Sequence, residues 1–130
     1  MAKAWELYRS SVGAEVVRKE IDKCDLKKHE SVRLAKIMER ALTGELLPRD
    51  RKPLGDGLWE LRLNCGERIF RLFYSEVPGE GPLLLALKFI NKKSTQGIKT
   101  DPVDIETARK RLSEWQNRQK GDDLAAEALK

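Results

Sequence analysis

Three segments in the middle of the chain carry the apolar residues of β-strands. Residues 58–64 and 68–76 mix apolar and charged positions, while residues 83–90 are an almost continuous apolar run. A turn around Gly66 separates the first two segments, and the proline- and glycine-rich stretch 78–82 separates the second from the third. The pattern predicts an antiparallel meander of three strands, with the most apolar strand inside the sheet and buried on both faces.

Helical periodicity flanks this meander on both sides. Before it, apolar residues recur at helical spacing over 12–23 and 30–43, and Gly44 supplies a left-handed end for the second helix. After it, Asp101 as the cap and Pro102 in the first turn mark the start of a third helix. The apolar stripe of this last helix consists of Ile105, Ala108, Leu112 and Trp115.

Two further segments complete the order of elements. Residues 4–9 alternate apolar and polar positions and predict a short first strand, after which Ser10 and Ser11 can cap the following helix. Residues 45–57 contain two prolines and two glycines and predict a loop, whose cations either lie in solvent or touch a phosphate chain. The order β-α-α-β-β-β-α predicts an α+β domain, with two N-terminal helices and a C-terminal helix packed on a small, mainly antiparallel sheet.

Length and composition fit one domain of this kind. The chain has 130 residues, of which 40% are apolar, enough for a single core. We expect the domain to span residues 1–118 and to be followed by a polar tail over 119–130, with a helix break at 120–123. No segment has the apolar length of a membrane span, and the first residues lack the apolar stretch of a secretory signal. The cytoplasm is therefore the expected location.

Charge and reactive residues narrow the range of partners. The 26 basic residues exceed the 21 acidic ones, and the net charge of +5 favours an anionic partner such as nucleic acid. Cys24 and Cys65 are too far apart for a metal-binding motif and are expected to be free, buried thiols. His29 is expected at a solvated helix start, and one histidine gives little basis for a zinc site or a histidine-based triad.

Cationic side chains interrupt the apolar strands of the meander. Arg62 and Arg71 lie in its first two strands, and Lys92 and Lys93 follow the third. An arginine inside a strand is costly to bury unless one face of the sheet stays hydrated or binds an anion. The pattern therefore predicts a cationic platform on the sheet, with a phosphate backbone as its anion. The structural alternative for Arg71 is an ion pair with a neighbouring acid such as Glu60.

Four short motifs occur in the same order and at nearly the same spacing as in a known family. They are GLWELR at 57–62, RLFY at 71–74, FINKK at 89–93 and PVDIETA at 102–108. With these motifs the chain resembles the HigB-like, phage-derived branch of the RelE toxin superfamily, over roughly residues 4–116. The resemblance covers nearly the whole of the expected domain.

The resemblance implies a small endoribonuclease toxin. Members of this superfamily typically dock in the ribosomal A site and cut mRNA, and an antitoxin encoded beside them, usually a helix-turn-helix protein in this branch, silences them. In such cleavage the ribose 2′-hydroxyl attacks the neighbouring phosphate and leaves a cyclic phosphate. The reaction needs a base and cations around the phosphate, and neither metal nor cofactor is expected. The antitoxin-binding surface and the oligomeric state stay open.

The resemblance also assigns roles to single residues. Arg71 matches the family arginine that faces the scissile phosphate, which a guanidinium can contact through two hydrogen bonds. Arg62, Lys92 and Lys93 match further basic positions of the catalytic site, and one of the two adjacent lysines could act as the base. The candidate RNA-binding residues are Arg51, Lys52, Arg68 and Tyr74.

Two departures from the better-known relatives leave a second function open. Those relatives place a tyrosine or histidine near the start of the last helix, where this chain has Asp104 and Ile105. Glu60 also stands where some relatives carry a lysine. The alternative function is a non-catalytic phage or prophage module that keeps the toxin fold and binds nucleic acid or protein. For Tyr74, packing under the sheet is the alternative to stacking on a base.

Overall fold

A five-stranded sheet forms the centre of the computed structural model, which describes residues 4–78, 82–93 and 99–128. The strand order across the sheet is β1-β5-β4-β3-β2, in which only the β1–β5 pair is parallel. The strands are β1 (Ala4–Leu7), β2 (Arg51–Gly55), β3 (Leu58–Asn64), β4 (Arg68–Pro78) and β5 (Pro82–Lys93). The prediction of a small, mainly antiparallel sheet is confirmed.

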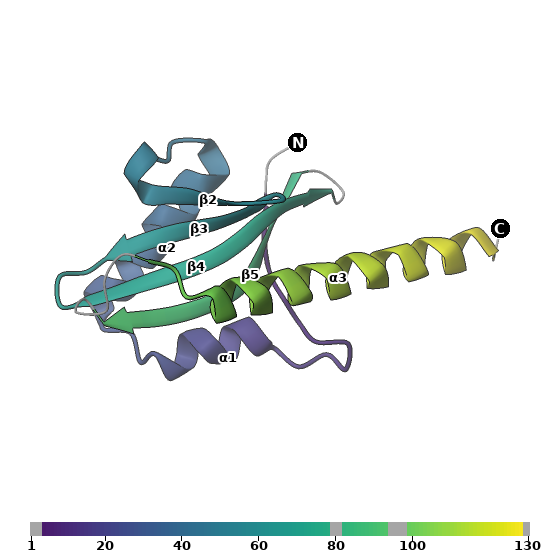
Figure 1. Ribbon diagram of the computed structural model, residues 1–130, viewed down its shortest axis with the longest axis horizontal. Helices are drawn as coiled ribbons and strands as arrows, with labels where there is room; N and C mark the ends of the chain where they lie inside the picture. The colour runs from purple at the N-terminus through teal and green to yellow at the C-terminus, as the bar shows by residue number, and fades with distance from the viewer. Residues whose placement is uncertain (1–3, 79–81, 94–98, 129–130) are drawn as a thin grey trace.

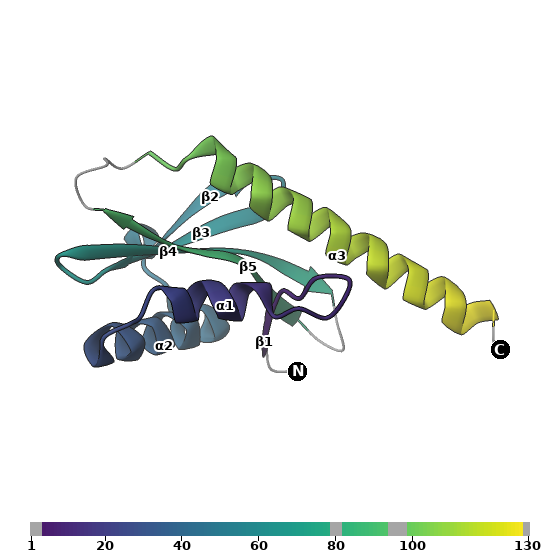
Figure 2. The ribbon, with the colours of Figure 1, turned by 90° about the horizontal axis from the view of Figure 1, so that it is seen from below.

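Helices cover both faces of this sheet. Helices α1 (Val16–Lys23) and α2 (Lys28–Thr43) lie on one side, and α3 (Pro102–Ala128) lies on the other (Figures 1 and 2). A short 3-10 turn, η1 (Pro48–Asp50), connects α2 to the edge strand β2. The predicted α+β fold is therefore confirmed. None of these helices, within the described ranges, has both the length and the apolar character that crossing a membrane requires.

The apolar run in β5 has the environment that its sequence predicts. β5 lies between β1 and β4, and contacts α1 on one face of the sheet and α3 on the other. Because both faces of the central part of the strand are covered, the apolar side chains at the successive positions 84–87 are all buried. The fully buried side chains of the core include Val17, Leu58, Leu61, Phe70, Phe73, Leu84, Leu85 and Leu87.

The segment predicted as a loop over 45–57 contains the edge strand β2, so that prediction is wrong in its second half. β2 pairs antiparallel with β3, from Arg51 opposite Leu61 to Gly55 opposite Leu58, with a shift in register after Pro53. Its side chains are mostly exposed, so the strand depends on backbone hydrogen bonds and shows no apolar pattern in the sequence. Proline is tolerated on such an edge strand, where one side of the backbone needs no partner.

The first helix is shorter than its apolar spacing predicts. It begins at Val16, while Val12 is 88% exposed and lies in a turn before the helix. Ser10 Oγ accepts the backbone N–H of Ala14 at 3.2 Å inside this turn, and so does not cap the helix. Gly13 has a φ of 83°, a left-handed conformation that a right-handed helix cannot include. The helix can form only after this residue.

The third helix starts as predicted and continues further than predicted. Asp101 Oδ1 accepts the backbone N–H of Val103 at 2.9 Å, which confirms the cap. The helix does not break at 120–123 but runs to Ala128, and Figures 1 and 2 show its end extending beyond the sheet. One glycine inside a helix costs only about 1 kcal/mol relative to alanine, so Gly121 alone does not end it.

Candidate functional site

Two arginines and one glutamate meet between neighbouring strands. Glu60 and Arg62 are two residues apart on β3 and therefore share one face of the sheet. Arg71 on β4 lies directly opposite Arg62 in the strand register. The side chain of Glu60 is fully buried, that of Arg71 is 3% exposed, and that of Arg62 is 33% exposed. We call these three residues the Glu60 cluster.

Hydrogen bonds tie the Glu60 cluster to the start of α3. Arg62 Nε donates to Glu60 Oε1 at 3.0 Å, and Arg71 Nε lies 3.5 Å from the same oxygen. The hydroxyl of Thr100 donates to Glu60 Oε2 and accepts Arg71 Nη1 at 3.2 Å. One carboxylate therefore faces two guanidinium groups, and the cluster keeps a net positive charge.

The cluster borders a basic groove at the free end of β3. β2 pairs with β3 only as far as Leu61, so the residues that follow form an open edge. The groove has a volume of about 900 Å³ and is lined by residues of α2, η1, β3 and β4. Its cationic side chains are Arg33, Lys36, Arg40, Arg49, Arg62 and Arg71. We call this hollow the α2–β3 groove.

Among the described residues, a single carboxylate, that of Asp50, lines the groove beside these six cations. Its Oδ2 accepts the backbone N–H of Leu47 at 2.8 Å, so this carboxylate stabilises the turn before β2. The apolar lining comes from Ile37, Leu63 and Ile69. The α2–β3 groove is therefore suited to an extended anion, and the part of its lining that the structure describes contains no aromatic ring on which a base could stack.

Lys92, the first of the two predicted lysines, does not join Arg62 and Arg71 in the groove lining. The register places Lys92 opposite Ile69, so it shares a face of the sheet with Arg71, but its Nζ donates to the carbonyl of Lys99. Lys93 ends β5 with its backbone opposite Arg68, and its side chain lies outside the described part of the chain.

The predicted RNA-binding residues are not among those that line the groove. Tyr74 is 2% exposed and packs edge-on against Trp5, as its structural alternative predicted. Arg51 stacks over Trp59 at 4.0 Å and donates to the Tyr74 hydroxyl at 3.3 Å. Lys52 is exposed on the edge strand β2. A nucleobase could reach Lys52 or Arg51, but it could not stack on Tyr74 without unpacking the core.

Arg68, the remaining candidate, has a structural role on the other side of the sheet. Its Nε donates to Glu30 Oε2 at 2.9 Å and its Nη1 donates to the carbonyl of Cys24 at 2.9 Å. The hydrogen bonds from Arg68, together with the backbone N–H of Lys27, lower the pKa of Glu30 to about 2. Arg68 thus joins β4 to the start of α2.

The two cysteines are free, as predicted, but are only half-buried, and the histidine is exposed, as predicted. Cys24 and Cys65 are free and half-buried, and burial raises the pKa of both thiols, which keeps them protonated. His29 is exposed in the first turn of α2. Within the described ranges, no three His, Cys, Asp or Glu side chains are grouped so that they could hold a metal ion.

Sequence reasoning missed the cations that α2 contributes. Arg33, Lys36 and Arg40 recur at i, i+3 and i+7, so they share one face of the helix. This spacing is visible in the sequence but is common on solvated helices, so by itself it points to no ligand. The contact between Thr100 and Glu60 has no sequence signal, because it depends on how the chain enters α3.

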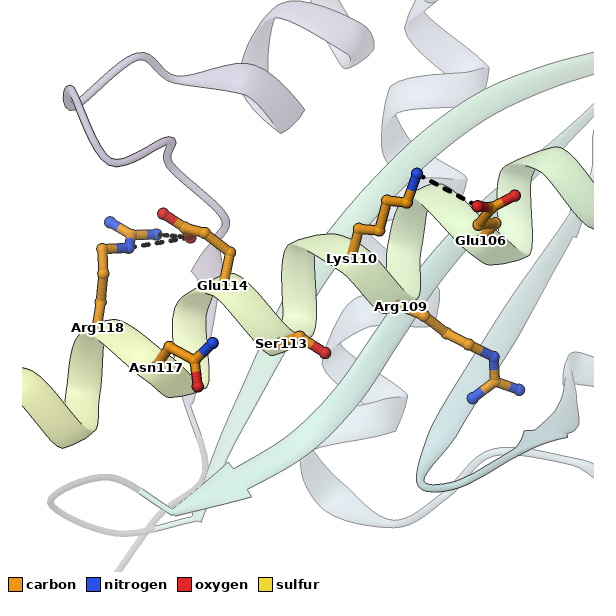
Figure 3. Close-up of a pocket in the computed structure, with 7 residues that line it drawn as sticks. All are labelled: Glu106, Arg109, Lys110, Ser113, Glu114, Asn117 and Arg118. Carbon is orange, nitrogen blue, oxygen red and sulfur yellow. Dashed lines mark hydrogen bonds and ion pairs between the residues drawn. The ribbon is translucent and has the colours of Figure 1, made fainter.

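A second hollow, of about 620 Å³, lies along the outer side of α3 (Figure 3). Every side chain that lines it comes from this one helix, and the charged ones largely pair with each other. Lys110 lies 3.2 Å from Glu106, and Arg118 lies 2.8 Å from Glu114. No second element encloses this hollow, so we regard it as helix surface and not as a binding site.

Comparison with known proteins gives matches over most of the chain. A family model described as "Phage derived protein Gp49-like" matches residues 19–113, from α1 to the middle of α3. Two relatives, each named "Probable endoribonuclease HigB1", come from the CDC 1551 / Oshkosh and ATCC 25618 / H37Rv strains of Mycobacterium tuberculosis. Each is 33% identical over 112 residues, which cover 85% of this chain and 83% of the relative.

Proposed function

The chain belongs to the Gp49-like family of phage-derived proteins, and on that premise we propose that it is a HigB-like endoribonuclease toxin that cuts mRNA on the ribosome. The relatives that carry an endoribonuclease name match it along most of both chains. The observation that carries the proposal is the meeting of Arg62 and Arg71 at the Glu60 cluster, on the border of a groove lined by cations.

The two guanidinium groups are suited to hold a phosphate during strand cleavage. The 2′-hydroxyl oxygen forms a bond to phosphorus, the bond to the 5′-oxygen breaks, and a cyclic phosphate and a 5′-hydroxyl result. In the transition state, negative charge accumulates on the phosphate oxygens, where Arg62 and Arg71 would stabilise it. Glu60 acts as a positioning residue in this scheme, because it orients both guanidinium groups.

The proton of the 2′-hydroxyl must pass to a base, and the 5′-oxygen must receive one. Lys92 is our candidate base, since it lies on the Arg71 face of the sheet and near the cluster along β5. Its Nζ could contact the 2′-hydroxyl once it exchanges its hydrogen bond to the Lys99 carbonyl for the substrate. Water can supply the proton to the leaving oxygen.

Replacement of Arg71 by alanine tests the proposal. In cells that express the protein from an inducible promoter, the wild type should arrest growth and Arg71→Ala should not. Removal of one group that stabilises the transition state lowers the rate by about 100-fold or more. Primer extension on an mRNA in a translating extract should show cuts for the wild type and none for Arg71→Ala.

Controls separate loss of chemistry from loss of structure. Arg18→Ala changes an exposed arginine on α1 and should leave growth arrest intact. Arg62→Gln is a second test, since Arg62 is one-third exposed and its loss is easier for the fold to tolerate than the loss of Arg71. Full toxicity in folded Arg62→Gln and Arg71→Ala proteins would contradict the proposed chemistry.

A second candidate function is a non-catalytic module that binds RNA. The 3% exposure of Arg71 favours it, because this side chain is already paired with Glu60 and donates a hydrogen bond to Thr100. Under the first proposal, an RNA phosphate must displace Thr100 from Arg71. A wild-type protein that binds RNA, permits normal growth and leaves mRNA intact on ribosomes would decide for the second candidate.

The partners follow from the proposed function. A toxin of this kind would act in the cytoplasm on ribosomes and mRNA, and would be held inactive by an antitoxin, in this branch usually a helix-turn-helix protein. Co-purification with the product of a neighbouring gene would identify that antitoxin.

A further inference from the structure

We propose that the α2–β3 groove holds the RNA strand beyond the cleavage point, with Arg33, Lys36 and Arg40 binding its phosphates. This inference rests on the proposed function and adds to it a path for the substrate. The groove includes Arg62 and Arg71 and continues around the open edge of β3 to the exposed face of α2. An RNA strand that has one phosphate at these two arginines and follows the groove therefore reaches α2.

The spacing of the α2 cations fits consecutive phosphates. Arg33 and Arg40 are seven residues apart, which is a rise of roughly 10 Å along a helix. A stacked nucleic-acid strand has one phosphate about every 3.4 Å along its axis, so this distance spans about three steps from one phosphate to the next. All three side chains are exposed, and Arg33 Nη1 donates to the carbonyl of Asn64 at 2.7 Å across the end of β3.

The chemistry of the groove favours RNA over an acidic protein segment. An acidic peptide usually adds apolar anchors that need pockets, whereas the apolar lining here is limited to Ile37, Leu63 and Ile69. In the described lining, six cations beside one carboxylate suit a ligand whose charge repeats along its backbone. Binding through phosphates alone would carry little sequence preference.

A matched pair of triple variants tests the path. The groove variant changes Arg33, Lys36 and Arg40 to glutamine. The control variant changes Arg18, Lys19 and Lys23 to glutamine, which removes the same charge from exposed positions on α1 that do not line the groove. Fluorescence anisotropy of a short single-stranded 2′-O-methyl RNA, which the protein cannot cleave through a 2′-hydroxyl, measures affinity over a series of salt concentrations.

The groove variant should bind the RNA more weakly. The logarithmic slope of its affinity against salt should decrease in magnitude by about 2, because three cations no longer neutralise phosphates. The control variant should keep the wild-type slope. A double variant, Lys36→Gln with Arg40→Gln, keeps the bond from Arg33 to Asn64 and should show a smaller decrease in the slope. It preserves the test if the triple variant fails to fold.

Four results would overturn the inference. Equal decreases in both triple variants would mean that net charge, and not the groove, attracts RNA. Unchanged RNA binding by the groove variant, while Arg71→Ala still abolishes mRNA cleavage, would remove the path and leave the proposed function standing. Unchanged RNA binding together with loss of a co-expressed protein partner would assign the groove to that partner. A wild type that neither binds nor cuts RNA would end both proposals.

Discussion

Arg71 and Glu60 carry opposite charges at positions that water hardly reaches. Removing two charges from water costs several kcal/mol each, and their attraction often no more than offsets this cost. An apolar pair of similar size would stabilise the sheet at least as well. The cluster is therefore better explained by what it positions, two guanidinium groups beside a basic groove, than by a contribution to stability.

Glu60→Gln should strongly destabilise the protein. The amide keeps the size of the side chain but removes the charge that pairs with both Arg62 and Arg71. Loss of one partner from a buried ion pair costs about 3 kcal/mol or more, and urea denaturation should show this decrease in the free energy of unfolding. Glu106→Gln breaks an exposed pair with Lys110 and should cost less than about 0.5 kcal/mol. Similar decreases in both variants would contradict this account.

At this scale, sequence reasoning could place Arg62 and Arg71 together but could not find all of their contacts. A tight turn at Gly66 fixes which residues of the two strands face each other, and both arginines belong to strands that the sequence predicts. Thr100 was not predictable, because its position depends on the path of the chain between β5 and α3. Tyr74 carried two interpretations until its burial was known.

Elements are predictable where burial gives them a pattern. α2, β3 and the start of α3 follow their predicted bounds closely, because each has one apolar face or a capping residue. β2 has neither, since backbone pairing alone makes it a strand. The length of α1 was overestimated because Val12 fits the apolar spacing, while the left-handed Gly13 excludes it from the helix.

Two glycines should respond in opposite ways to the same substitution. Gly44 ends α2 with a φ of 74°, and Gly121 lies inside α3, yet an added methyl group would contact nothing within 4 Å at either position. Gly44→Ala should destabilise the protein by about 1 kcal/mol, because alanine is strained in the left-handed region. Gly121→Ala should stabilise the helix by up to about 1 kcal/mol. Thermal unfolding of both variants measures this, and shifts of the same sign would refute it.

The ion pair between Glu30 on α2 and Arg68 on β4 should make the stability of the protein depend on pH in the acidic range. The pKa of Glu30 is about 2 in the folded protein, against an ordinary value of 4.5. Its stabilising contribution is therefore complete above about pH 4.5 and is lost as the pH falls through about 2. Unfolding near pH 3 to 4 should take up as much as about one proton at this site.

Urea denaturation across this pH range should show the effect as a decrease in the free energy of unfolding. The slope that belongs to this site should be absent in Glu30→Gln, which cannot titrate. Glu106→Gln, at an exposed carboxylate, should keep the slope. An unchanged pH profile in Glu30→Gln would show that Arg68 does not hold this carboxylate in its charged form.

In the whole molecule, α3 does more than cover the sheet. Its middle binds β1 and the segment that follows it, because Trp115 donates to Glu6 at 3.2 Å and Tyr8 donates to Glu114 at 3.1 Å. Arg118 donates to the carbonyl of Ser10 at 3.3 Å. The groove lies instead beside α2 and the free end of β3. The contacts by which α3 holds the start of the chain are thus distinct from the α2–β3 groove, which we propose binds RNA.

Removal of residues 119–130 should therefore leave both stability and function unchanged. Every side chain that the structure describes between Gln119 and Ala128 is exposed, and among the described residues the last hydrogen bond from α3 to the segment before α1 comes from Arg118. Tolerance of truncation depends on burial and hydrogen bonding, both of which favour the shortened chain. Its melting temperature should stay within about 2 °C of the full chain, and its expression should arrest growth equally.

A chain that stops before Trp115 provides the contrast. It lacks a side chain that is only 9% exposed and the hydrogen bond to Glu6, so its free energy of unfolding should be lower by about 3 kcal/mol or more. Differential scanning calorimetry on the three chains would separate the two cases. A large decrease on removing 119–130 alone would mean that the end of α3 contributes to the fold despite its exposure, for example by holding a second molecule. Gel filtration of the full chain would then detect that assembly.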